Sequence, residues 1–239
     1  MKKTMSMTVP GIVETMPASV YQTDNRGMED IDVADLVIPR AKLLQPLSPE
    51  LRDDKHLRPG MIINSLTKEE LPADIIPVFY FKSFARFNAR DRKLPGYVEG
   101  VDPGALIWQT RDASDPRVIK ECSFGLNGET PLALTTLNFF CITLPDSGIP
   151  VVVSFSKTSY KAGRNFLSLC KLRGGAMFSR RYRLTAKEES NDKGNYFTLV
   201  VNPAESCDAD QLAAGERYFN QFATKRDAVK PHIEDAETL

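Results

Sequence analysis

The chain has 239 residues, of which 42% are hydrophobic and 26% are charged, a composition typical of globular proteins. No apolar run approaches the roughly 20 residues that a membrane-spanning helix needs, so we expect no contact with a membrane. The 31 basic residues are balanced by 31 acidic ones, so an overall charge cannot identify a partner. The lysines near the N-terminus are not followed by an apolar core, which predicts a protein without a signal peptide, in a cytoplasm.

Metal and cofactor sites are not expected. A zinc site needs closely paired cysteines or histidines, because one local turn must present two ligands at once. The chain has four cysteines and two histidines, and no two cysteines are closer than 19 residues. We therefore predict small apolar cysteines in a reducing compartment, no metal and no cofactor.

The chain is predicted to form a single domain with two tails. Residues 1–35 lack hydrophobic periodicity and are interpreted as a mobile arm. Residues 36–226 form the domain, and residues 227–239 form a mildly acidic tail. Near the start of the domain, the apolar run 36–44 is broken by a proline and suits an edge strand, and residues 61–64 form a short strand.

The most aromatic stretch, DIIPVFYFKSFARF at 74–87, predicts a long strand that bends and pairs with two neighbours. An insertion of loops and small hairpins follows at 88–129, with strands expected at 105–109 and 118–123. It carries the only tryptophan, Trp108.

A strand at 130–144 turns back through a Pro- and Gly-containing segment into a second strand at 151–155. Apolar residues at helical spacing predict a helix over 157–172, which Gly174 and Gly175 end.

The last part of the domain predicts a hairpin and a helix. Residues 178–186 and 196–201 have the composition of strands, and Asn202-Pro203 should end the second one. Residues 208–223 predict a C-terminal helix with an apolar stripe.

Together these elements follow the order strand, strand, strand, helix, strand, strand. That is the order of an OB-like five-stranded barrel with a helix between strands three and four. The predicted class is mainly β (α+β), with a loop and hairpin insertion and a C-terminal helix.

Basic charge is concentrated in one window. Residues 147–187 contain nine lysines and arginines and no acidic residue. Such segregation, mixed with aromatic residues, favours a surface for a polyanion, and the alternative is a solvated face without a partner.

Within and beside this window the segments FSKTSYKAGR (155–164), FSRRYRLT (178–185) and NDKGNYFTL (191–199) resemble bacteriophage single-stranded DNA-binding proteins of the OB type. The resemblance covers about residues 60–202. It implies a non-catalytic protein that coats or protects single strands during replication or recombination, in the host cytoplasm if a phage encodes it. Such proteins often end in a strongly acidic tail with an aromatic residue, whereas the last six residues here carry Glu234, Asp235 and Glu237 and end in leucine.

Binding of a single strand needs cations for phosphates and exposed rings for bases. Arg181 and Arg183 are the first choice for phosphate contacts, because strand alternation places them on a polar face. Tyr182 could stack on a base or lie in the core. Trp108 could stack on a base or pack locally within the insertion. The complete set of candidates is Tyr80, Lys82, Arg86, Arg90, Trp108, Lys157, Tyr160, Lys161, Arg164, Arg181, Tyr182 and Arg183.

Two alternatives remain open. A protein-interaction or virion-associated structural module would use the basic face to dock an acidic partner. A metal-dependent nuclease is suggested by Asp146 followed by Ser154-Phe155-Ser156-Lys157, but Phe155 stands where that layout needs a carboxylate. We therefore expect no enzyme. The expected partners are single-stranded DNA, with RNA as an open alternative, replication or recombination proteins, and further copies of the chain.

Overall fold

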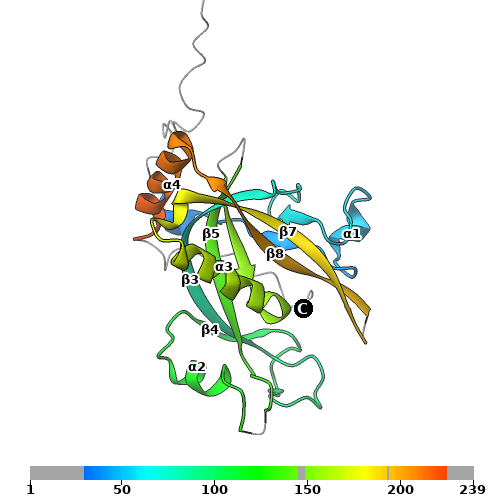
Figure 1. The fold of residues 1–239 in the computed structure, drawn as a ribbon. Helices are drawn as coiled ribbons and strands as arrows, with labels where there is room; N and C mark the ends of the chain where they lie inside the picture. Colours follow the sequence, from blue (N-terminus) through cyan, green and yellow to red (C-terminus); the bar gives the residue numbers. More distant parts are fainter. Residues whose placement is uncertain (1–29, 127, 145–148, 193, 225–239) are drawn as a thin grey trace, which may run out of the picture.

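The computed structural model describes residues 30–126, 128–144, 149–192 and 194–224 (Figure 1). The first 29 residues of the expected arm and the acidic tail at 227–239 lie outside these residues. The end of the expected arm is part of the fold, because the 3-10 turn η1 (Val33–Asp35) inserts Val33 into a core cluster. The protein is mainly β with a few helices, as the sequence predicts.

The long strand β3 (Asp74–Phe87) organises an open antiparallel sheet with the order β6-β5-β3-β7-β8. It pairs with β5 over most of its length and with β7 only at its start, where Ile75 faces Tyr182. A bulge lies between Pro77 and Phe79, where such an irregularity bends a strand, as predicted. The strand pairs with three neighbours, whereas the sequence predicts two. The other strands are β4 (Leu106–Thr110), which pairs with the end of β3, β5 (Leu134–Thr143), β6 (Pro150–Phe155), β7 (Arg180–Asn191) and β8 (Gly194–Ser206).

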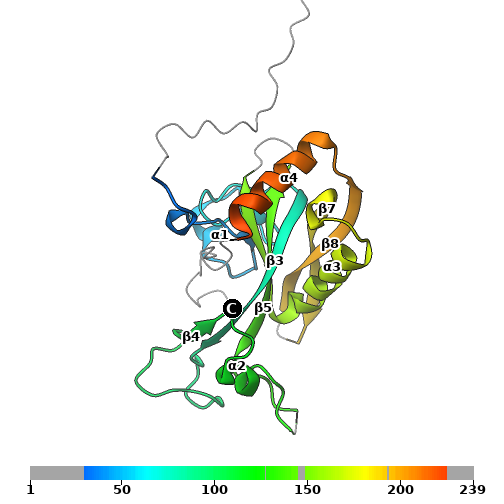
Figure 2. The same cartoon turned by 90° about the vertical axis from the view of Figure 1, so that its left-hand side faces the viewer.

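Helices cover both faces of this sheet (Figures 1 and 2). On one face α3 (Tyr160–Leu172) packs Phe166 and Cys170 against the sheet. On the other face α4 (Ala209–Phe222) packs Phe222 against Phe140, with ring centroids 5.0 Å apart. Each face therefore has its own apolar core, which explains why β3 and β5 are buried on both sides.

The sheet ends at two edges, β6 and β8, and no strand pairing joins them in the described part of the chain. The predicted barrel is therefore an open sheet. The segment at 39–45 lies across this opening: Val152 N donates to Pro39 O at 2.8 Å, and the side chain of Gln45 bonds to the backbone of Phe197. The expected strand at 36–44 is shortened to β1 (Ala41–Leu43), which pairs with β2 (Ile62–Asn64) in a separate two-stranded sheet.

Two predictions of local structure are wrong. The expected strand at 118–123 is the helix α2 (Pro116–Glu121), because Asp115 caps it through Arg117 N at 2.9 Å and proline suits the first helical position. Strand β8 also continues beyond Asn202-Pro203. Proline is tolerated there because β8 is an edge strand. Short turns complete the fold: α1 (Glu50–Asp53), η2 (Lys157–Ser159) and η3 (Met177–Ser179).

Among the described residues, no helix is long and apolar enough to cross a bilayer.

Candidate nucleic-acid interface

The two arginines chosen first for phosphate contacts are held by acidic side chains. Arg183 forms a two-point ion pair with Asp74, with Nε 2.8 Å from Oδ1 and Nη2 3.2 Å from Oδ2. These hydrogen bonds lower the pKa of the Asp74 carboxyl. Arg181 pairs with Glu205 on β8 through one guanidinium nitrogen, Nη2. Each of the two arginines therefore already has an acidic partner in the fold.

The predicted residues of the insertion form a second internal network. Arg86 Nη1 lies 2.9 Å from Glu121 Oε1, and Trp108 Nε1 donates to Glu121 Oε2 at 2.9 Å. The Trp108 side chain is 8% exposed, and the guanidinium of Arg117 lies 5.2 Å from the centre of its ring. Trp108 is thus a core residue of the insertion rather than an exposed ring for base stacking.

Tyr182 is also a core residue. It is 1% exposed and packs edge-on against Phe166, with ring centroids 4.9 Å apart. Burial raises the pKa of its hydroxyl well above the ordinary value. The alternation of β7 explains the arrangement: Tyr182 points toward α3, and the arginines on either side of it point to the opposite face.

Five of the predicted cations have no carboxylate within ion-pair distance among the residues that the structure describes. They gather around the start of α3, and we call them the α3 basic surface: Lys82, Arg90, Lys157, Lys161 and Arg164.

Several contacts place these cations together. Lys157 and Arg90 line one shallow pocket, and partial burial together with Arg90 lowers the pKa of Lys157. Lys161 and Arg164 follow at spacings of four and three residues, so they share one side of η2 and α3. Lys82 is opposite Leu137 in the sheet, a residue that α3 approaches closely at Gly163.

Two tyrosines adjoin the α3 basic surface. Tyr80 lies on the same face of β3 as Lys82, and both Tyr80 and Tyr160 are half-buried. Burial, with a smaller effect from nearby Tyr160, raises the pKa of Tyr80 to about 12. The ring of Tyr80 packs on Phe139 at 5.2 Å, and its hydroxyl has no hydrogen-bond partner among the described residues.

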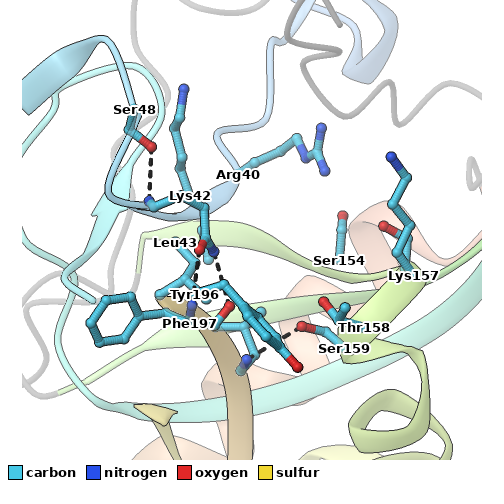
Figure 3. A pocket seen from close by; sticks show the side chains of 14 residues that line it. Arg40, Lys42, Leu43, Ser48, Ser154, Lys157, Thr158, Ser159, Tyr196 and Phe197 are labelled. Atoms are coloured by element: carbon cyan, nitrogen blue, oxygen red, sulfur yellow. Dashed lines mark hydrogen bonds between the residues drawn. The ribbon is translucent and has the colours of Figure 1, made fainter. Parts of the chain in front are cut away.

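A pocket of about 330 Å³ opens next to this surface, between β1, β6, η2 and β8 (Figure 3). We call it the β1–β8 pocket. Its lining contains three cations and no carboxylate. The residues that carry its chemistry are Arg40, Lys42, Ser154, Lys157, Ser159 and Tyr196.

The hydroxyl groups of this pocket are oriented by the fold. Ser154 Oγ donates to Asn138 Oδ1 at 2.8 Å, and Asn138 Nδ2 donates to Ser83 Oγ at 2.9 Å inside the sheet. Ser159 Oγ accepts from Leu199 N at 3.3 Å. Of the lining residues only Lys157 is predicted from the sequence, because the pocket joins segments that lie more than 100 positions apart.

The described residues contain no group of three or more His, Cys, Asp or Glu side chains that could hold a metal ion. Phe155, which stands where the nuclease layout needs a carboxylate, is fully buried in the core beside Phe166. Asp146, the other residue of that layout, lies outside the described residues.

A family model described as Pam3 phage gp34-like protein matches residues 7–228, which is most of the chain. No curated protein and no solved structure gives a significant match.

Proposed function

We propose that this chain, which belongs to the Pam3 phage gp34-like protein family, is a phage protein that binds single-stranded DNA without catalysis. It would coat or protect single strands during replication or recombination in the host cytoplasm. RNA offers the same phosphates and base faces, so RNA is a second possible ligand of the same surface.

The proposal depends on one observation, which is that some predicted cations have acidic partners in the fold and the others do not. Arg86, Arg181 and Arg183 each form an ion pair with an acidic residue, whereas the α3 basic surface has no such partner among the described residues. Cations that cluster without carboxylates repel one another, and the phosphates of a polyanion would relieve this repulsion. The half-buried rings of Tyr80 and Tyr160 adjoin these cations and supply apolar faces for bases.

The strand order supports an OB-like arrangement. Strands β3, β5, β6, β7 and β8 would be strands one to five, and α3 lies between the third and the fourth. In this proposal residues 39–45 take the place of direct pairing between strands three and five.

Two double variants of equal charge change test the site. We expect Lys161→Ala with Arg164→Ala to weaken binding of a labelled oligonucleotide at least about tenfold, since charge-assisted contacts to phosphates are lost. The slope of log affinity against log salt should also decrease by about 1.4, which corresponds to two contacts with a single strand.

The matched control is Arg181→Ala with Arg183→Ala, which removes two cations that already have partners. It should leave the affinity within about threefold, because these charges contribute little to a phosphate site. Equal binding by the parent and the Lys161/Arg164 double variant would show that this surface is not the interface. An absence of binding by the parent at low salt would refute the proposed function.

A second candidate, a protein-interaction or virion-associated module, is favoured by apolar side chains on the insertion. Ile119 is 63% exposed and Phe124 is 72% exposed, and such neighbouring apolar residues mark interaction sites. Sedimentation of the parent and of Phe124→Asp separates the two candidates. Concentration-dependent association that this substitution abolishes, without DNA binding by the parent, would favour the module.

A further inference from the structure

The β1–β8 pocket is distinct from the α3 basic surface. It shares only Lys157 with that surface, and its walls come from the segment across the sheet opening, the edge strand β6, the turn η2 and the edge strand β8 (Figure 3). Its volume of about 330 Å³ is at the lower end of the range for small-molecule sites.

The positively charged side chains in the lining favour an anionic ligand. Arg40, Lys42 and Lys157 line the pocket without a carboxylate among the lining residues. Glu50, outside the lining, holds the ammonium of Lys42 at 2.6 Å. Lys157 has no acidic partner in the described part of the chain, so an anion in the pocket would find this ammonium available.

The polar groups differ from one side of the pocket to the other. Ser159 accepts a backbone hydrogen bond from Leu199, so the proton of its own hydroxyl is available beside Lys157. Ser154 gives its proton to Asn138 and therefore offers only lone pairs to a ligand. A bare phosphate needs donors alone, whereas a nucleotide also has sugar and base groups that donate.

An aromatic wall completes the pocket. The half-buried ring of Tyr196 lines it, and the hydroxyl of this tyrosine lies 3.2 Å from Glu189 Oε2. The ring is therefore anchored at its far end, in a position to stack on a base. In Figure 3 the side chains of Arg40 and Lys157 lie near one another, with the hydroxyl of Ser154 between them.

We propose that the β1–β8 pocket binds one nucleotide, with its phosphate monoester at Lys157 and its base against Tyr196. The inference deepens the proposed function and rests on it in one respect, since the nucleotide would be the phosphorylated end of a bound strand. A free nucleotide carries the same chemistry, so the test includes both.

The experiment is calorimetric titration of the full chain at low salt with deoxynucleoside 5′-monophosphate, with inorganic phosphate, and with oligonucleotides that carry or lack a 5′-phosphate. We expect the nucleotide to bind at least about tenfold more tightly than inorganic phosphate. We also expect a preference for the 5′-phosphorylated oligonucleotide. Equal affinities for nucleotide and phosphate, or no binding of nucleotide at millimolar concentration, would overturn the inference.

Lys157→Asn is the diagnostic variant. Lys157 has a φ of 46°, and asparagine tolerates this left-handed region better than most residues. The variant should lose at least about tenfold in nucleotide affinity and should lose the preference for the 5′-phosphate. Lys157→Arg keeps the positive charge and should retain both the nucleotide affinity and the preference for the 5′-phosphate. Unchanged nucleotide affinity in Lys157→Asn would contradict the assignment.

A second pair of variants tests the ring without touching the charge. Tyr196→Ala should weaken nucleotide binding by about fivefold or more, because the stacking surface is lost. Tyr196→Phe should weaken binding less than Tyr196→Ala does, because it keeps the ring and loses only the hydroxyl contact with Glu189. If Tyr196→Ala keeps the parent affinity, the base does not lie on this ring and the pose is wrong.

The failure of this inference can be distinguished from failure of the proposed function. Lys161→Ala with Arg164→Ala should weaken oligonucleotide binding and leave mononucleotide affinity unchanged. Oligonucleotide binding without nucleotide binding would overturn the pocket alone. Nucleotide binding without oligonucleotide binding would refute the proposed function and leave the pocket as a site for free nucleotides.

Discussion

The side-chain amide of Gln45 forms two hydrogen bonds with the backbone of Phe197, one to the carbonyl oxygen and one from the N–H, both at 2.9 Å. This is the pattern by which a neighbouring strand would satisfy an edge strand. Because β8 is an edge of the sheet, Gln45 protects backbone groups that would otherwise be open to another chain.

Replacing Gln45 should therefore destabilise the fold. We expect Gln45→Ala to lower the free energy of unfolding by about 1–3 kcal/mol, because two partly buried backbone groups lose their partner. Urea denaturation measures the change. Gln221→Ala, at an exposed amide on α4, is the control and should change stability by less than about 0.5 kcal/mol. Equal stabilities of the two variants would contradict the role of Gln45.

The ion pair of Lys42 and Glu50 should be more costly to break than a surface pair. Its atoms are 2.6 Å apart, and the two side chains are 10% and 12% exposed. Lys42→Met should lower the free energy of unfolding by about 3 kcal/mol, since the ion-pair partner that remains for Glu50 in the described part of the chain is Lys68, at 3.7 Å. A loss below about 1 kcal/mol would indicate that water screens the pair.

The same variant should change the pH dependence of stability. Burial raises the pKa of Glu50, but Lys42, a backbone hydrogen bond and Lys68 together outweigh it, so the pKa lies below the ordinary value of 4.5. The parent therefore has this stability above pH 4.5 and loses it as the pH falls through the lower, folded-state pKa. In Lys42→Met burial should instead raise the pKa of the Glu50 carboxyl. The carboxyl of the variant then takes up a proton at higher pH than that of the parent, so the difference in stability between parent and variant should narrow as the pH falls through 4.5. A constant gap between pH 3 and pH 7 would disprove this.

Gly163 marks the closest approach of α3 to the sheet. A Cβ atom at this position would lie 2.5 Å from Cβ of Phe155. Gly163→Ala should therefore destabilise the protein by about 1–3 kcal/mol, although alanine is the better helix former. Asn165→Ala, at an exposed position of the same helix, should be neutral or stabilising. Stabilisation by Gly163→Ala would show that the helix can move away from the sheet.

The cysteine thiols should be unreactive in the native protein. Burial raises the pKa of all four thiols, and it raises the pKa of Cys170 and Cys207 to about 11. Because the thiolate is the reactive form, a disulfide reagent at pH 8 should label the folded chain slowly and the urea-unfolded chain rapidly. Rapid labelling of a thiol without urea would identify a site where the fold opens locally.

Local pattern was sufficient to predict the main elements of this fold. The aromatic run of β3, the apolar periodicity of α3 and the stripe of α4 each specify their element within a few residues. The helix α2 was missed because Val118 and Ile119 suggested a strand. The preceding Asp115-Pro116, a helix start signal, was available in the sequence.

The candidate site was less predictable, because strand register decides which charges are available. Arg183 and Asp74 are 109 positions apart, and only the pairing of β3 with β7 brings them together. Sequence alone therefore ranked Arg183 above Lys161 and Arg164, although the two helix residues keep their charge available. The β1–β8 pocket was unpredictable for the same reason.

The position of Trp108 has a practical consequence. The chain has a single tryptophan, and its indole is sealed in the small core of the insertion by Glu121 and Arg117. Its fluorescence therefore reports on the insertion and not on the two apolar cores beneath α3 and α4. A spectral shift on mixing with a polynucleotide would signify rearrangement of the insertion, and an unchanged spectrum would be compatible with full occupancy elsewhere.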